Sequence, residues 1–130
     1  MITIRNLQRI FEMENEIIHE QVNGLTNADS LLQPQPGGNC LNWFMCHMLT
    51  NQVEIITALG GTPPFDPLII DRYQRDSEPI RGEGEGVLAL NTLVSLHDQT
   101  HTVLIELLST MGEEDFSQEI TIGERTTTLG

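Results

Sequence analysis

Two histidines at helical spacing are the residues of this chain whose types and positions best suit chemistry. His97 and His101 form a His-x-x-x-His pair, and residues four apart on a helix share one face. Two neutral imidazoles at that spacing can bind one transition-metal ion, with a third ligand from another helix. His47 belongs to a different predicted helix and is the candidate third ligand. Three histidines would leave a fourth position open for water or substrate, which is typical of catalytic zinc.

These histidines also have a purely structural interpretation. A histidine on an apolar helix face is usually a hydrogen-bonded residue of the core or of its rim. His97 and His101 have Asp98 and Glu106 close by in the sequence as partners of that kind. Spacing alone leaves both interpretations open.

Other catalytic patterns receive less support. Glu16 and His19 match the Glu-x-x-His element of di-iron bundles, but such sites need that element twice and the chain has one copy. Cys46 precedes His47, yet adjacent helical residues point about 100° apart, so a Cys–His nucleophile pair is possible only through contact with another helix. Cys40 and Cys46 lie about 240° apart around one predicted helix, so we expect no disulfide between them.

Three amphipathic helices have to position these residues. Apolar residues recur at helical spacing over 7–22, 41–59 and 87–111. The stripes expected to face the core are, in chain order, Leu7, Ile10, Phe11, Ile17, Ile18, Val22 and Leu25; then Cys40, Phe44, His47, Met48, Asn51, Ile55, Ala58 and Leu59; then Leu90, Leu93, Val94, His97, His101, Leu104 and Leu108. The connection 62–86 is long enough to be functional or mobile, and 113–130 reads as extended or irregular. We therefore expect one all-α domain over 1–130, an antiparallel bundle.

The charge balance excludes several classes of partner. The chain has 19 acidic and six basic residues, a net charge of −13, and all six bases are arginine. Such a field repels phosphate groups, so we expect no nucleic-acid partner and no anionic membrane partner. A small cationic partner or a metal ion remains compatible with this charge. Because no apolar run reaches roughly 18 residues and no signal peptide is recognisable, we expect a soluble cytoplasmic protein.

One segment carries a family resemblance. Gly38-Asn39-Cys40 is followed by Trp43 and, four residues further on, by His47. This pattern resembles the DinB-like superfamily, the YfiT-like group of four-helix-bundle proteins. Further similarities lie in the segments 59–63, 77–80, 111–116 and 126–130, so the likeness spans most of the chain.

The resemblance implies an antiparallel four-helix bundle that often holds a divalent metal ion. In the family, one ligand is a histidine on the second helix and two come from a His-x-x-x-His on the fourth. His47 matches the first of these, whereas the chain stops at Gly130, where a fourth helix would begin. His97 and His101 are on the third helix, so spacing and not the family pattern makes them candidates. Cys46 replaces the small residue that the family commonly has there.

Two functional hypotheses follow. The first is a metal-dependent enzyme, because some family members transfer low-molecular-weight thiols such as bacillithiol or mycothiol and others are regarded as hydrolases. Zn²⁺ or Ni²⁺ on His47, His97 and His101 would lower the pKa of a thiol or water and present it as a nucleophile. The alternative is a non-enzymatic, stress-related helical protein that acts as a homodimer, because a groove left by an absent fourth helix has to be covered.

Overall fold

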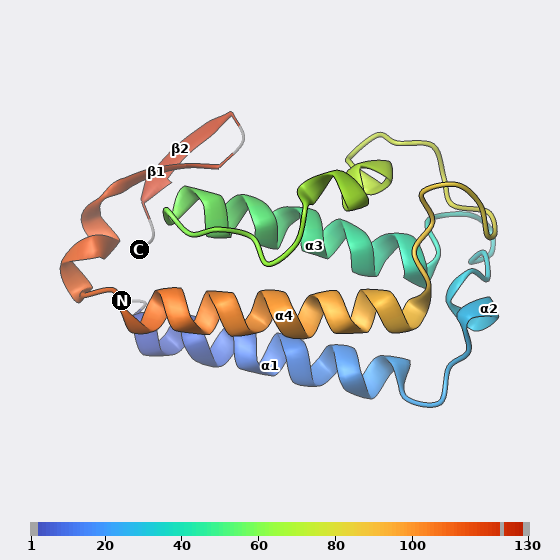
Figure 1. Cartoon of the computed structure of the whole chain (residues 1–130), viewed down its shortest axis with the longest axis horizontal. Helices are drawn as coiled ribbons and strands as arrows, with labels where there is room; N and C mark the ends of the chain where they lie inside the picture. The colour runs from blue at the N-terminus through green and yellow to red at the C-terminus, as the bar shows by residue number, and fades with distance from the viewer. Residues whose placement is uncertain (1–2, 123, 129–130) are drawn as a thin grey trace.

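Three long helices lying side by side form the body of the protein (Figure 1). The computed structural model describes residues 3–122 and 124–128. The elements are α1 (Ile4–Val22), α2 (Asn27–Ser30), α3 (Leu41–Ala58), the 3-10 helix η1 (Pro67–Tyr73), α4 (Leu90–Ser109), the 3-10 helix η2 (Glu113–Ser117), β1 (Glu119–Ile122) and β2 (Arg125–Thr128). The chain is therefore mostly helical, and the three predicted helices are confirmed.

Local sequence signals account for the helix ends. Thr3 begins α1 as an N-cap, because its hydroxyl accepts a hydrogen bond from the Asn6 amide at 3.2 Å while the Asn6 side chain accepts one from the Thr3 amide at 3.0 Å. The helix therefore begins before the predicted position 7. Gly60, with φ +77°, follows the end of α3 in a left-handed conformation that glycine adopts without strain.

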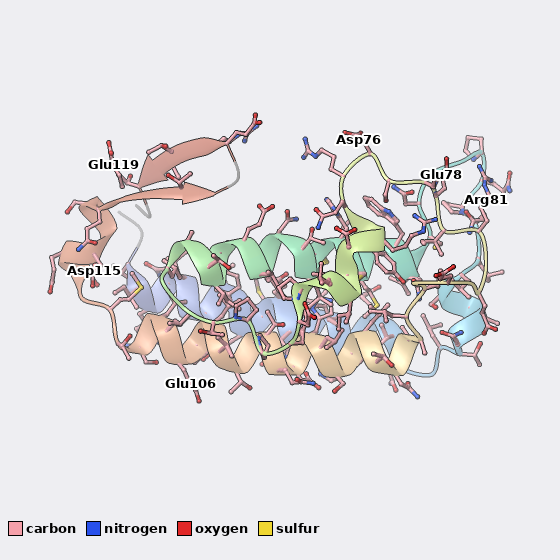
Figure 2. All side chains as sticks on the ribbon, turned by 45° about the horizontal axis from the view of Figure 1, so that its top comes forward. Asp76, Glu78, Arg81, Glu106, Asp115 and Glu119 are labelled. Atoms are coloured by element: carbon pink, nitrogen blue, oxygen red, sulfur yellow. The ribbon has the colours of Figure 1, made fainter. Side chains whose placement is uncertain are left out.

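The segment 113–128 is irregular and extended, as predicted. After η2, the strands β1 and β2 form an antiparallel hairpin in which Glu119 pairs with Thr128 and Ile122 with Arg125. β1 contacts α3, so the hairpin lies against one end of that helix (Figure 1). Charged side chains such as Glu106 and Glu119 point away from the helices (Figure 2).

α4 contacts both α1 and α3. Most of its predicted core stripe is confirmed, with Leu90, Leu93, His97, Leu104 and Leu108 buried. None of the described helices is long and apolar enough to cross a membrane. The core lies where α3, α4 and η1 pack together.

The core face predicted for α3 is wrong. Phe44, from that stripe, is 58 % exposed, and His47 and Met48 are only half-buried. The buried residues of α3 are instead Asn42, Met45, Cys46, Leu49, Thr50, Gln52, Val53 and Ile56. Because α4 and η1 both pack on α3, apolar residues occupy most of its circumference and periodicity cannot select one face.

The prediction for α1 is also only partly correct. Ile18 is the buried residue of this helix, whereas Ile10 and Ile17 from the predicted stripe are 48 % and 46 % exposed. α1 packs against α4 along one edge of its apolar face. The other edge of that face remains accessible, and it forms one wall of the groove described below.

The long connection between α3 and α4 is part of the core. Ile70, Tyr73 and Ile80 are almost completely buried, and η1 packs on α3. The Tyr73 hydroxyl donates to Asn42 Oδ1 at 2.9 Å and accepts from the Leu88 amide at 2.8 Å. These bonds attach the loop to α3 and to the segment that leads into α4.

Candidate functional site

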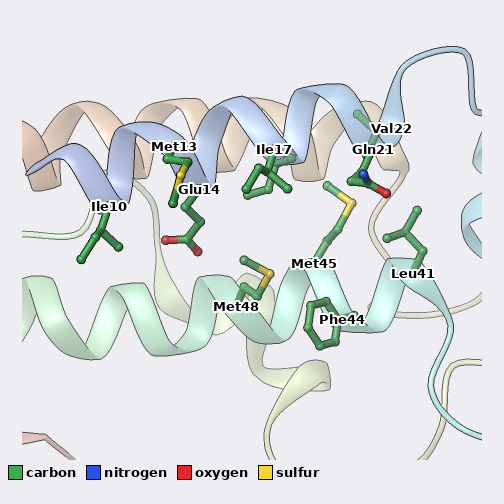
Figure 3. Close-up of a pocket in the computed structure, with 11 residues that line it drawn as sticks. Ile10, Met13, Glu14, Ile17, Gln21, Val22, Leu41, Phe44, Met45 and Met48 are labelled. Carbon is green, nitrogen blue, oxygen red and sulfur yellow. The ribbon is translucent and has the colours of Figure 1, made fainter. Parts of the chain in front are cut away.

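An open apolar groove runs between α1 and α3 (Figure 3). Its volume is about 350 Å³, and its lining consists of Ile10, Met13, Glu14, Ile17, Ile18, Gln21, Val22, Leu41, Phe44, Met45 and Met48. Met13 and Phe44 are each more than half exposed. Exposed apolar side chains gathered in one hollow are a common mark of a binding surface.

Glu14 is the one acidic residue of this lining. It lies four residues after Ile10 and four before Ile18, so the helical repeat places it on the apolar face of α1. Its carboxylate points from α1 toward α3 (Figure 3), where Oε1 accepts a hydrogen bond from Gln52 Nε2 at 3.0 Å. Burial raises the pKa of Glu14, while the hydrogen bond from Gln52 and the charge of His101 lower it.

Two further polar groups near Glu14 have unused hydrogen-bonding capacity. Gln52 is buried, and its Oε1 atom has no hydrogen-bond partner. His101, on α4, is near enough for its charge to act on the pKa of Glu14, and its Nδ1 atom is also buried without a partner. Unpaired buried polar atoms are unusual in proteins, which makes this cluster a candidate site.

Sequence reasoning missed Glu14 and Gln52. An acidic residue in the middle of an apolar stripe was the available signal for Glu14. Gln52 gave no comparable signal, because the predicted face of α3 did not include it. The pair is visible only when α1 and α3 are placed beside each other.

The three histidines predicted as metal ligands occupy different environments. His47 Nδ1 lies 3.0 Å from the Tyr73 carbonyl oxygen, and its ring stacks on Trp43 with centroids 4.5 Å apart. His97 is buried between α4 and α3, where Nε2 donates to the Met45 carbonyl at 2.9 Å. Within the ranges 3–122 and 124–128, no three histidine, cysteine or acidic side chains are grouped so that they could hold a metal ion. The described residues thus do not form a ready three-ligand site.

The pKa of His97 is lowered to about 4, mainly because burial disfavours the charged imidazolium. The ring is therefore neutral at pH 7, with Nε2 carrying the proton that it donates to Met45. Its Nδ1 atom then has a free lone pair, which is buried and unpartnered. In this position the His97 ring joins α4 to α3 through its hydrogen bond to the Met45 carbonyl.

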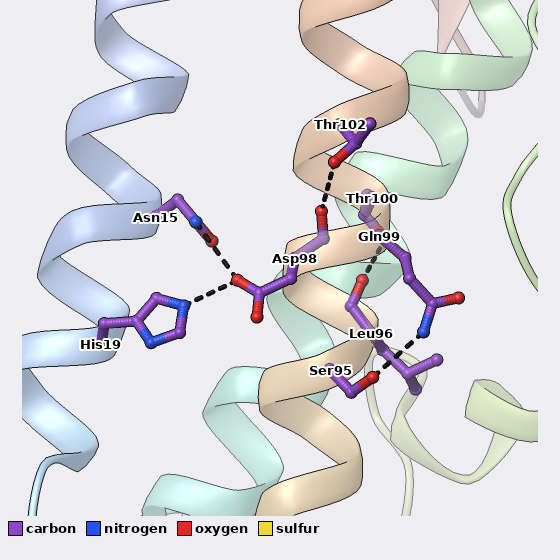
Figure 4. Close-up of polar contacts among 8 residues, drawn as sticks. All are labelled: Asn15, His19, Ser95, Leu96, Asp98, Gln99, Thr100 and Thr102. Atoms are coloured by element: carbon purple, nitrogen blue, oxygen red, sulfur yellow. Dashed lines mark hydrogen bonds and ion pairs between the residues drawn. The ribbon is translucent and has the colours of Figure 1, made fainter.

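Asp98 does not pair with His97 or His101, although it is adjacent to one of them in sequence. It lies 2.6 Å from His19 Nε2 and 3.3 Å from Asn15 Nδ2, and so it links α4 to α1 (Figure 4). Burial raises the pKa of Asp98, but the hydrogen bonds from His19 and Asn15 outweigh burial and hold the pKa below its usual value. The predicted surface position of His19 is confirmed, since its side chain is 48 % exposed.

The two cysteines are free thiols, as predicted from their spacing, and both are buried. Burial raises the pKa of Cys46 to about 12, so this thiol is protonated at neutral pH and is a poor nucleophile.

Neither a protein-family model nor a curated protein matches the chain. The groove and the polar residues in it are therefore the features from which a function can be derived.

Proposed function

We propose that the protein is a non-catalytic binding protein whose groove between α1 and α3 holds a small molecule with an apolar body. The observation that carries the proposal is the continuous apolar lining of a space of about 350 Å³, within the range of small-molecule sites. Three flexible methionine side chains belong to the lining, namely Met13, Met45 and Met48. Such side chains adapt to ligands of different shape.

Binding of the neutral dye Nile red tests this proposal. We expect the wild-type protein to bind the dye, and Ile17→Asp to weaken binding about tenfold or more, because a carboxylate in an apolar wall is costly to desolvate. Ile69→Asp is the matched control, because Ile69 is an isoleucine of similar exposure on η1, outside the groove. Fluorescence titration measures both. Equal weakening by the two substitutions, or no binding by the wild type, would contradict the proposal.

A second copy of the chain is the other occupant to consider, since the homodimer predicted from the sequence stays a prediction. Sedimentation velocity on the same variants distinguishes the two. A dimer that Ile17→Asp converts to a monomer would place another copy in the groove and overturn small-molecule binding there. A wild-type monomer that binds the dye supports the proposal.

One observation favours a second candidate, the metal-dependent enzyme of the thiol-transferase or hydrolase type. Metal-ligating histidines usually donate their other ring N–H to a carboxylate or a backbone carbonyl. His47 has this arrangement, with Nδ1 beside the Tyr73 carbonyl oxygen, and so Nε2 would be its ligand atom. The DinB-like membership and four-helix bundle belong to this candidate, and they rest on the resemblance around His47.

Metal analysis after reloading with Zn²⁺ or Ni²⁺ tests this second candidate. It predicts about one ion per chain in the wild type, loss of that ion in His47→Ala, and retention in His19→Ala. His19 is a suitable control because it is an exposed histidine on another helix. His97→Ala and His101→Ala then report whether α4 contributes ligands. A wild type without stoichiometric metal would eliminate this candidate.

A further inference from the structure

We propose that Glu14, in the wall of the groove, and Gln52, which hydrogen-bonds to it from behind that wall, form a binding site for a primary ammonium group, so that the ligand is a small alkylamine. The inference rests on the proposed function, because the apolar lining has to hold the alkyl chain. The inference adds the chemical class of the polar head group of the ligand, which is an ammonium group. Glu14 and Gln52 are not among the ligands of the metal candidate.

The negative charge of the Glu14 carboxylate has no ion-pair partner among the described residues. This carboxylate lies among apolar side chains, and the hydrogen bond that it receives comes from a neutral amide. Among the described residues, no arginine or histidine lies within salt-bridge distance of it, since the ion pair of this structure joins His19 and Asp98. A partly buried carboxylate without a cation is costly, and a ligand cation would remove that cost.

Unused hydrogen-bond acceptors lie beside the Glu14 carboxylate. Glu14 comes from α1 and Gln52 from α3, and they meet through the 3.0 Å hydrogen bond. The Gln52 Oε1 atom, buried and unpaired, is a second acceptor at this place, and His101 Nδ1 on α4 is a third unpaired atom nearby. An ammonium group has three N–H donors and no acceptor. It therefore matches a carboxylate flanked by unused acceptors better than a hydroxyl group would.

A second copy of the chain could also supply a cation. The chain has no lysine, so the permanently charged basic side chains that a second copy could place on Glu14 are its six arginines. The net charge of −13 attracts small cations from solution and opposes the approach of another copy. A small amine is therefore favoured over self-association at this position.

Calorimetric titration with three hexyl compounds tests the inference. We expect hexylamine to bind the wild type about tenfold or more tightly than 1-hexanol, because it adds charged hydrogen bonds to the same apolar contact. Glu14→Gln is expected to reduce hexylamine to the affinity of 1-hexanol while leaving 1-hexanol binding in place. Hexyltrimethylammonium, which has the charge but no N–H donors, is expected to bind more weakly than hexylamine.

The controls separate this inference from the proposed function. Glu16→Gln removes the same charge from an exposed position of α1 and should leave the preference for hexylamine intact. Equal effects of Glu14→Gln and Glu16→Gln, or equal binding of hexylamine and hexyltrimethylammonium, would overturn the ammonium site. Binding of 1-hexanol without any preference for the amine overturns this inference alone. No binding of any hexyl compound overturns the proposed function as well.

A second variant guards against a folding effect of the first. Gln52→Met removes the unpaired oxygen and keeps the length of the side chain, and it should also abolish the preference for hexylamine. Thermal unfolding of both variants shows whether they are folded. A folded Gln52→Met protein that binds hexylamine as the wild type does would contradict the role of this amide.

Discussion

Replacing Tyr73 with phenylalanine is expected to lower the free energy of unfolding by about 2–6 kcal/mol. The hydroxyl is buried and holds two partners, because it donates to Asn42 Oδ1 and accepts from the Leu88 amide. Phenylalanine fills the same space but leaves both partners without their bond. Each such group costs about 1–3 kcal/mol when it stays buried and unpaired, so the two losses add to a large effect. Urea unfolding measures it.

Thr100→Val is the matched control for this prediction. Its hydroxyl is equally buried, but it donates at 2.7 Å to the Leu96 carbonyl of its own helix. That carbonyl already belongs to the α4 ladder, so its loss should cost only about 1 kcal/mol. Similar losses for Tyr73→Phe and Thr100→Val would contradict the claim that the Tyr73 network holds the loop 62–86 on the bundle.

This network also shows what local patterns leave out. The partners of Tyr73 are 31 and 15 residues away in the sequence, and η1 has no amphipathic period by which it could be recognised. The sequence predicted a long loop there and nothing about its burial. Long-range hydrogen bonds of this kind arise from the packing of a loop on a helix, and no spacing rule encodes them.

The helices were predictable for a physical reason that also explains the errors in their faces. Regular apolar spacing identified all three segments, and in α4 most of the residues on that spacing are buried. In α1 and α3, residues such as Ile17 and Phe44 kept the spacing of a covered face. They line the groove and not the core. Periodicity thus detected the apolar surfaces correctly and could not say which of them another helix covers.

For the polar residues of the site, too, the sequence pattern identified the helix face but not the contacts between helices. The spacing of His97 and His101 placed both on one side of α4, but what they act on lies on other helices: His97 bonds to the Met45 carbonyl, and the charge of His101 acts on the pKa of Glu14. Pairing across helices depends on rotation and height of each helix, which the sequence pattern does not specify. The groove therefore became a candidate only when the three helices were assembled.

Acidification from pH 7 to pH 4 is expected to cost the protein about 3 kcal/mol of stability through His97 alone. The folded protein lowers the pKa of this histidine from the ordinary 6.5 to about 4 because the ring is buried. Between these values the unfolded chain binds a proton that the folded protein does not. Stability from His97 is therefore complete above pH 6.5 and is lost as the pH falls toward 4. Glu14, whose pKa is raised by burial, changes stability in the opposite direction and offsets part of the loss.

The variant His97→Gln isolates this contribution. Glutamine can still donate to the Met45 carbonyl, but it does not titrate, so the stability of the variant should fall much less between pH 7 and pH 4. Leu93→Ala is the control, because loss of a buried leucine costs about 2–5 kcal/mol without removing a titrating group. It should lower stability at every pH and keep the wild-type slope. Because the slope and not the absolute stability is compared, a wild-type slope in His97→Gln would show that His97 is not kept neutral by its burial between α3 and α4.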